Sequence, residues 1–133
     1  MSFVVFFFVL LADQFSKFLF WNAIGDGLNR GVSFGLMPGF LWVLIGLLLM
    51  LILFLITRSK FNKQALGLFF GGAVSNLVDR IIFEGIRDWL PIPFISLQNN
   101  LADWCIFIGV VWIVLGELQG IIIKQRNERE QIN

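Results

Sequence analysis

The 133-residue sequence has no histidine and only one cysteine, Cys105. These two absences exclude Ser-His-Asp and Cys-His nucleophilic sites, zinc sites built on histidine or clustered cysteines, and any disulfide within the chain. Charged residues are scarce as well, at 14% of the chain against about 25% in an average soluble domain. Any chemistry must therefore come from carboxylates, amides, Lys, Arg, hydroxyls or the backbone, and we expect no metal or other cofactor.

Hydrophobic residues, by contrast, make up 58% of the chain, and the mean hydropathy is +0.85. A soluble domain of this size cannot bury so much apolar surface, and a disordered chain has the opposite composition. The net charge of +1 provides no basic surface for nucleic acid. The sequence therefore predicts a small integral membrane protein.

Four stretches are long and apolar enough to cross a bilayer as helices, which takes about 20 residues. They cover residues 3–21, 40–56, 65–83 and 101–123. Long apolar runs without alternation favour helices over barrel strands. No linker or internal repeat divides the sequence, so we expect an all-α membrane protein with a single domain over residues 1–133.

The basic residues indicate how these helices are oriented. Six lie in the second connection and the C-terminal tail, whereas the other two connections contain only Arg30 and Arg87. Because Lys and Arg are enriched in cytoplasmic loops, the sequence predicts that both termini are cytoplasmic. Four tryptophans fall at the predicted outer interface, where indole rings concentrate: Trp21, Trp42, Trp89 and Trp104.

Several charged and amide side chains fall within the predicted spans, where a charge costs at least about 2.5–3.5 kcal/mol. Asp13 and Lys17 are four residues apart on one helix face and can pair. Gly72, Asn76 and Asp79 share a face of the third span. Gly72 and the glycine before it would also let another helix approach closely.

In the predicted topology four carboxylates converge on the outer half of the membrane: Asp13, Asp79, Asp88 and Asp103. One interpretation is structural, with Asp13–Lys17 and Asp79–Arg80 as ion pairs that join helices. It accounts less well for Asp88 and Asp103, whose only nearby cation in the sequence is the residue before Asp88. Two facing carboxylates can instead share one proton and activate water against a peptide carbonyl.

Five ordered blocks of this sequence resemble the lipoprotein signal peptidase family, also called signal peptidase II. They are residues 13–17 (D-Q-F-S-K), 29–34 (N-R-G-V-S-F), 71–80 (G-G-A-V-S-N-L-V-D-R), 87–89 (R-D-W) and 100–103 (N-L-A-D). The blocks extend from the first predicted span to the fourth. The ten-residue block is specific by itself, and five blocks in the family's order make the resemblance strong.

The resemblance implies an aspartic endopeptidase of the bacterial cytoplasmic (inner) membrane, with Asp88 and Asp103 as its catalytic carboxylates. Family members remove the signal peptide of prolipoproteins by cutting just before a cysteine that carries diacylglycerol, and the antibiotic globomycin blocks them. The resemblance also implies four membrane helices, with a small extracytoplasmic β-cradle and a short interfacial helix built from the outer connections. We expect a monomer whose partners are the lipidated prolipoprotein, membrane lipids and a globomycin-type inhibitor.

The other residues of the matching blocks are expected to support the site or to hold substrate: Asn29, Arg30, Gly31, Gly72, Asn76, Asp79, Arg80, Asn100 and Ala102. The structural alternatives are helix packing for the residues of the third span and an ordinary turn for Asn29 and Arg30. Asp13 and Lys17 are expected to have a structural role behind the site rather than a chemical one.

Asn100 and Asp103 have the spacing of a helix N-cap and the third helical residue. Free backbone N–H groups at a helix N-terminus favour the ionised form of a carboxylate. We therefore expect Asp103 to carry the negative charge of the pair and Asp88 more often to carry the proton. Trp89 stands where the family usually has Phe, and Trp104 where it usually has a small residue, so both affect the shape of the pocket.

Two other functions stay open at this point. A small four-span transporter can use one acidic residue to bind protons or cations, although such a protein places that carboxylate in the middle of the membrane. A non-catalytic scaffold or an inactive relative has no need for an intact pair of Asp88 and Asp103.

Overall fold

The computed structural model describes residues 1–24, 28–29, 62–94 and 97–132, together with scattered helical residues between 45 and 55. The expected second span, residues 40–56, lies largely outside the described residues. Arg30 and Gly31 lie outside them as well.

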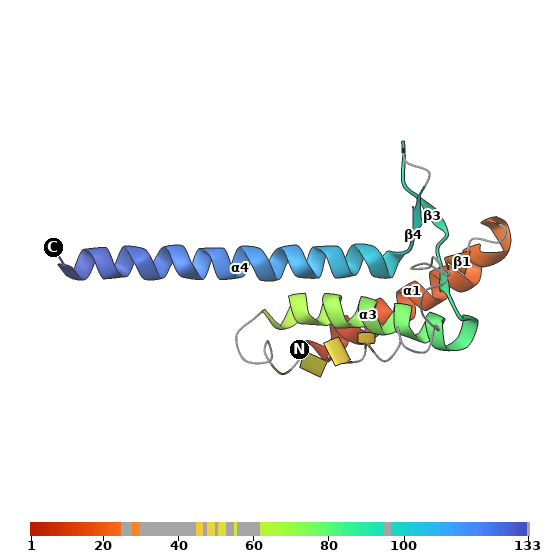
Figure 1. The fold of residues 1–133 in the computed structure, drawn as a ribbon, viewed down its shortest axis with the longest axis horizontal. Helices are drawn as coiled ribbons and strands as arrows, with labels where there is room; N and C mark the ends of the chain where they lie inside the picture. Colours follow the sequence, from red (N-terminus) through yellow and green to blue (C-terminus); the bar gives the residue numbers. More distant parts are fainter. Residues whose placement is uncertain are drawn as a thin grey trace.

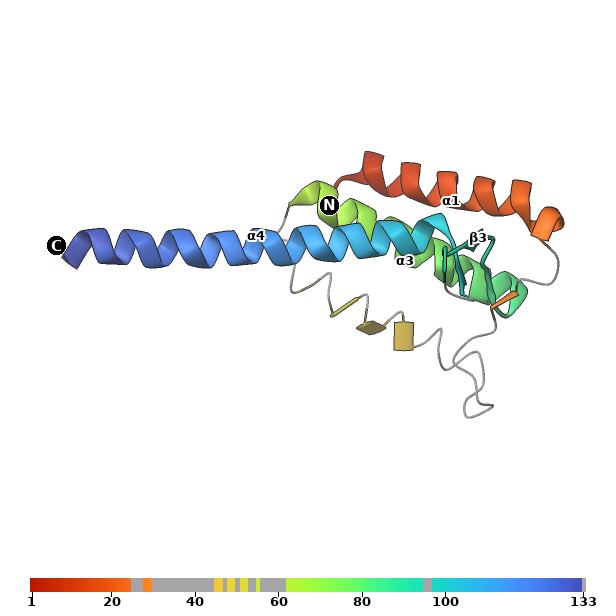
Figure 2. The same ribbon diagram turned by 90° about the horizontal axis from the view of Figure 1, so that it is seen from above.

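Three long helices form the body of the molecule: α1 (Phe3–Ile24), α3 (Lys63–Phe83) and α4 (Leu101–Ile132). Each contains a segment long and apolar enough to cross a membrane, which confirms three of the expected spans. α3 packs against both α1 and α4, whereas α1 and α4 touch much less (Figure 2). α1 and α3 begin at the same end of the molecule, where the Ser2 backbone N–H donates to the Lys63 carbonyl at 2.7 Å.

α4 runs in the opposite direction and extends well past the other two helices (Figure 1). Residues 124–132, expected only as a tail after the fourth span, continue this helix without a break. Two exposed ion pairs at i,i+4 spacing lie along the extension, Lys124–Glu128 at 3.9 Å and Arg126–Glu130 at 2.9 Å. Such pairs favour helix locally, because side chains four residues apart are neighbours on one face.

A capping side chain and a left-handed residue mark the two ends of α3. The Asn62 side chain caps the N-terminus and accepts hydrogen bonds from the backbone N–H groups of Gln64 at 2.7 Å and Ala65 at 3.4 Å. Glu84 ends the helix in a left-handed conformation with φ of 58°. The chain then turns directly into the strand that precedes Asp88.

Two adjacent glycines in α3 each allow a different helix to approach. A Cβ on Gly71 would lie 2.8 Å from the Phe6 carbonyl oxygen of α1. A Cβ on Gly72 would lie 2.5 Å from the Ala102 carbonyl oxygen of α4. The close approach expected from this glycine pair is therefore confirmed, and it brings the first turn of α4 directly onto the polar face of α3.

Four two-residue strands form two small antiparallel sheets beside the helix ends. β1 (Leu28–Asn29) pairs with β2 (Ile86–Arg87), with Asn29 opposite Ile86. β3 (Leu90–Pro91) pairs with β4 (Gln98–Asn99), with Leu90 opposite Asn99. The first sheet brings Asn29 close to the segment that contains Asp88, and the second forms a hairpin between Asp88 and α4. No short helix is present among the described residues of the outer connections, namely 28–29, 84–94 and 97–100.

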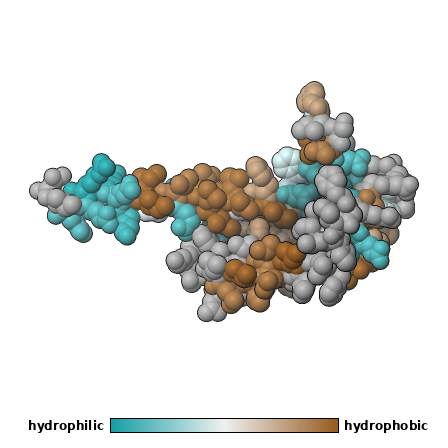
Figure 3. Space-filling view, viewed as in Figure 1, coloured by the Kyte–Doolittle hydropathy of each residue, from teal (hydrophilic) through white to brown (hydrophobic). Residues whose placement is uncertain are grey.

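The distribution of polarity is opposite to that of a soluble protein. Large apolar side chains are exposed along the helices, and α4 is hydrophobic along its middle and hydrophilic towards its C-terminus (Figure 3). Fully buried side chains instead include Asp13, Lys17, Asp79 and Asn100. A surface of this kind fits a lipid environment, with the polar groups enclosed between the helices.

The close approach at Gly72 leads to a prediction about stability. Gly72→Ala places a methyl group against the backbone of α4 and is expected to reduce the free energy of unfolding by about 1–3 kcal/mol. Thermal unfolding of the purified protein in detergent would measure the change. Gly116→Ala is the matched control, because its Cβ would meet nothing within 4 Å. If both variants unfold at the same temperature, the close contact between α3 and α4 is not as the structure describes.

Candidate active site

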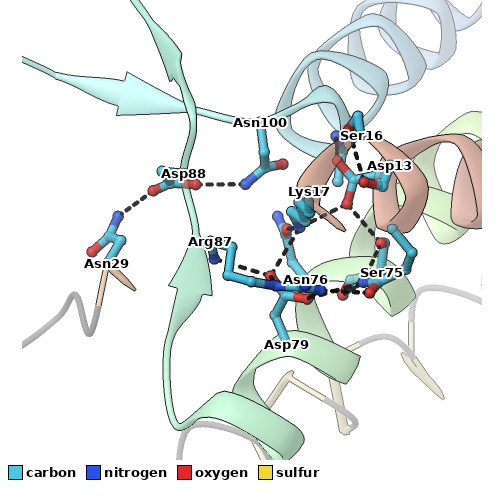
Figure 4. A network of polar contacts seen from close by, with 12 residues as sticks. Asp13, Ser16, Lys17, Asn29, Ser75, Asn76, Asp79, Arg87, Asp88 and Asn100 are labelled. Carbon is cyan, nitrogen blue, oxygen red and sulfur yellow. Dashed lines mark hydrogen bonds and ion pairs between the residues drawn. The ribbon is translucent and has the colours of Figure 1, made fainter. Parts of the chain in front are cut away.

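A cluster of buried polar side chains joins all three helices at the end where the small sheets lie (Figure 4). Its members come from segments far apart in sequence: α1, β1, α3, β2 with the residue after it, and the start of α4 with the residue before it. A charge buried in this way is costly unless it is paired and hydrogen-bonded. The contacts within the cluster show how that cost is offset.

Lys17 is the fully buried cation on which several of these contacts depend. Its Nζ lies 2.6 Å from Asp13 Oδ2 and 3.3 Å from Asp79 Oδ2. It also donates a hydrogen bond to Asn76 Oδ1 at 2.8 Å. The predicted pairing of Asp13 and Lys17 is therefore confirmed, and the same ammonium group also binds two side chains of α3.

Asp13 connects α1 to both other helices. Its Oδ2 accepts a hydrogen bond from Ser75 Oγ of α3 at 2.7 Å. Its Oδ1 accepts the backbone N–H of Ala102 in the first turn of α4 at 2.8 Å. An N–H in this turn has no partner within its own helix, so Asp13 satisfies a free backbone donor and holds the helix start in place.

Asp79 is paired with Arg87 rather than with its neighbour in sequence, Arg80. Arg87 Nη2 lies 2.7 Å from Asp79 Oδ1, and the Arg87 backbone N–H donates to Asp79 Oδ2 at 2.9 Å. Within the described residues Arg80 forms no hydrogen bond or ion pair. The Asp79–Arg80 pair proposed from the sequence is therefore wrong. The end of α3 is joined to β2 instead, through both the side chain and the backbone of Arg87.

Gln14 completes this connection from α1. Its Oε1 accepts from Arg87 Nη2 at 2.7 Å, and its Nε2 donates to Asp79 Oδ1 at 3.0 Å. The same Nε2 lies 2.9 Å from Ser75 Oγ. The Arg87 guanidinium also sits over the Phe83 ring, 4.1 Å from its centroid. These contacts fix the backbone immediately before Asp88.

Asp88 follows β2, outside the candidate membrane spans, and is buried. Its Oδ2 accepts from Asn29 Nδ2 at 2.8 Å, and its Oδ1 accepts from Asn100 Nδ2 at 2.6 Å. Burial raises the pKa of Asp88 above the ordinary value for aspartate. The two amide hydrogen bonds act in the opposite direction, and the nearby charge of Asp103 raises the pKa further.

Asp103 lies in the first turn of α4. Its backbone N–H donates to Asn100 Oδ1 at 2.9 Å, which confirms Asn100 as the N-cap of the helix. Its Oδ1 accepts from Asn76 Nδ2 at 2.8 Å. Asn100 thus contacts both aspartates, because its amide nitrogen binds Asp88 while its oxygen caps the turn that holds Asp103.

Trp89, the residue after Asp88, is held by contacts with α1 and β4. Its ring stacks on Phe20 of α1 with centroids 4.3 Å apart, and its backbone N–H donates to the Asn99 carbonyl at 3.1 Å. The indole N–H is buried and has no hydrogen-bond partner among the residues that the structure describes. Trp89 therefore helps to exclude solvent from the segment that contains Asp88.

The predicted site residues divide by position. Asn29, Asn76, Asp79, Asn100, Asp13 and Lys17 all contribute side chains to the cluster. Gly72 and Ala102 contribute through backbone proximity, and Arg30 and Gly31 lie outside the described residues. Within the described part of the chain, no group of three or more His, Cys, Asp or Glu side chains is arranged to hold a metal ion.

Four members of the cluster were not predicted as site residues from the sequence: Gln14, Ser16, Ser75 and Arg87. All four lie within the blocks that match the family, at residues 13–17, 71–80 and 87–89. The Ser16 hydroxyl donates a hydrogen bond to the Asp13 carbonyl at 2.8 Å. Ser75 precedes Asp79 by four residues, so the helical periodicity of α3 places both on one face and could have indicated it. The partners of Arg87 could not be predicted, because they depend on how the chain folds back after α3.

The family model for signal peptidase II matches residues 5–119 of this chain. The chain belongs to the signal peptidase II family. A lipoprotein signal peptidase of Shouchella clausii is 26% identical to it over 97% of both chains. That of Bartonella quintana is 34% identical and aligns with 76% of this chain and 68% of its own.

Solved structures agree with this signal peptidase II assignment at the level of the fold. A structure described as a bacterial membrane enzyme superimposes with a TM-score of 0.70, at 24% identity, over 88% of this chain and 92% of its own. A second structure with the same description gives a TM-score of 0.68 over 89% and 87% of the two chains.

The pairing of Asp79 with Arg87 can be tested by stability. Arg87→Met removes the nearer of two cations from the buried Asp79 carboxylate and leaves Lys17 at 3.3 Å. The loss is expected to cost about 3 kcal/mol in the free energy of unfolding. Arg126→Met is the matched control, because the exposed Arg126–Glu130 pair contributes at most about 1 kcal/mol. Unfolding in denaturant would measure both. A larger loss for Arg80→Met than for Arg87→Met would contradict the assignment.

Proposed function

We propose that this protein is a lipoprotein signal peptidase that hydrolyses the peptide bond just before the lipidated cysteine of diacylglyceryl prolipoproteins. Asp88 and Asp103 form its catalytic pair and activate water. The observation that carries the proposal is the Asn100 side chain, which contacts both residues in a chain of this family. This arrangement needs no histidine, thiol or metal, in keeping with the composition.

The ion pairs of the cluster support Asp88 and Asp103 as an acid–base pair. Asp13 is paired with Lys17, and Asp79 with Arg87. Within the described residues no cation forms an ion pair with Asp88 or Asp103. Two nearby carboxylates favour the state in which they share one proton, because two close negative charges are unfavourable.

The surroundings of the two residues favour different protonation states. Asp103 accepts a hydrogen bond from Asn76 and lies at the N-terminus of α4, where free N–H groups stabilise a negative charge. Asp88 follows a strand rather than starting a helix, so it lacks this stabilisation from its own backbone, and burial raises its pKa. We assign the negative charge of the resting enzyme to Asp103 and the proton to Asp88.

Hydrolysis then follows in two steps. Asp103 takes a proton from water as the oxygen attacks the scissile carbonyl, and Asp88 gives its proton to the carbonyl oxygen. In the second step the tetrahedral intermediate returns a proton to Asp88 as its C–N bond breaks. Asp103 passes its proton to the leaving amine. Both residues are restored, and one water molecule has been consumed.

The remaining roles follow from position. We assign Asn29 and Asn100 to orienting Asp88, and Asn76 to orienting Asp103. Arg80, together with Arg30 and Gly31, is assigned to binding the substrate. Asp13 and Lys17 hold the three helices around the pair.

We place the protein in the bacterial inner membrane as a monomer with four spans and cytoplasmic termini. The catalytic pair then lies near the extracytoplasmic interface, where a lipidated cysteine can present its peptide bond while its acyl chains stay in the bilayer. The two small sheets form the cradle for the peptide in this arrangement, and a globomycin-type inhibitor competes for the same site.

Substitution of either aspartate tests the mechanism. Asp88→Asn and Asp103→Asn are each expected to lower cleavage of a purified diacylglyceryl prolipoprotein at least about 100-fold, since each removes a proton carrier. Mass spectrometry of the product measures loss of the signal peptide. Glu128→Gln, which changes an exposed carboxylate of α4, is the matched control and should cleave like the wild type. Equal activity in all three variants, or an inactive wild type, would reject the proposal and leave a transporter or scaffold.

The pH dependence provides a second test. Asp88 must be protonated to act as the acid, so activity falls as the pH rises through its raised pKa. Asn29→Leu removes a hydrogen bond that favours the ionised form, and this raises the pKa of Asp88 further. The alkaline limb of the kcat profile is therefore expected to move to higher pH. A shift to lower pH would contradict the assignment of the proton to Asp88.

A further inference from the structure

The β3–β4 hairpin carries apolar side chains that contact little of the protein. Phe94 is fully exposed, at 107% of its reference area, and Leu97 is 60% exposed. Pro91 and Pro93 are exposed as well. Residues 90–99 include no charged residue. Apolar side chains in an uncharged loop outside the helices mark an interaction surface, because water would oppose their exposure.

The length of α4 indicates how deep in the membrane this hairpin lies. Lys124 is the first basic residue of the helix, and it marks one boundary of the apolar segment. A span of about 20 residues counted back from there reaches Trp104, a residue type that concentrates at membrane interfaces. The Trp104 side chain is 43% exposed on the helix surface.

The base of the hairpin therefore falls in the interfacial layer. Asn99 and Asn100 lie about four to five residues beyond Trp104, or roughly 6–8 Å along the axis at 1.5 Å per residue. The polar layer on each side of the hydrocarbon is about 5–7 Å thick. From the end of α4 the hairpin runs across the helix axis rather than along it (Figure 1). Its tip consequently stays at the depth of its base instead of extending away into water.

We propose that the tip of the β3–β4 hairpin, at Pro93, Phe94 and Leu97, lies in the polar interfacial layer of the surrounding bilayer, at the end of α4 opposite its basic residues. The partner is the lipid surface itself. This accounts for the uncharged sequence, the exposed aromatic ring and the orientation of the hairpin together. It is independent of the proposed catalytic function.

The hairpin lies in the chain between Asp88 and α4, so a contact of its tip with lipid affects both. Asp88 lies two residues before β3, and Asn100 directly follows β4. A tip held in the interface fixes the depth of the polypeptide that joins Asp88 to the start of α4. The lipid surface would thereby help to set the level at which the buried polar cluster sits in the membrane.

Spin labelling in lipid vesicles tests this contact. The native thiol is removed by Cys105→Ala, and single labels are attached through Phe94→Cys, Phe107→Cys and Glu130→Cys in separate proteins. Phe107 is exposed on the apolar part of α4 and serves as the lipid reference. Glu130, at the charged end of α4, serves as the water reference. The measurement is the ratio of collision rates with oxygen, which concentrates in lipid, and with a water-soluble nickel chelate.

The label at residue 94 is expected to give a ratio several-fold above that at residue 130 and below that at residue 107. A ratio equal to that at residue 130 would place the tip in water and overturn the proposal. Protection from both reagents would also overturn it, because protein rather than lipid would then cover the tip. Circular dichroism of each labelled protein verifies that the helices are folded.

Discussion

The buried ammonium group of Lys17 sits at the centre of the contacts that hold the three described helices together. A cation enclosed among membrane helices must be compensated by carboxylates and hydrogen-bond acceptors at close range. Asp13 supplies one from the same helix, and Asp79 and Asn76 supply the others from α3. Each of these groups has further partners, so compensation of one charge extends into a network that fixes three helices, β2 and the first turn of α4.

Close helix approach makes this network possible. The glycine pair of α3 lets the backbones of α1 and α4 come near enough for short side chains to span the gap. Asp13 can then reach the backbone of Ala102, and Asn76 can contact both Lys17 and Asp103. The stabilising contacts and the candidate catalytic contacts are therefore parts of one arrangement.

The same arrangement separates the environments of the two aspartates. Asp88 is held on an irregular segment between two short strands, with amides as its partners, and its burial raises its pKa. Asp103 begins a long helix and faces an amide that is itself bound to Lys17. An acid and a base can thus be obtained from two identical side chains by differences in position alone.

Features that depend on local pattern could be predicted from the amino-acid sequence. Apolar runs located the three described helices, the spacing of Asp13 and Lys17 predicted their pairing, and Asn100 was recognisable as a helix cap. The ion-pair partner of Asp79 could not be predicted in this way. Arg80 is adjacent to it in the chain, but the turn after Glu84 brings Arg87 back to it instead. The sequence also could not show that α4 continues through its charged end or that the hairpin lies across its axis. Periodicity and capping act within a few residues, whereas buried charges pair with whichever groups the packed helices and sheets bring within reach.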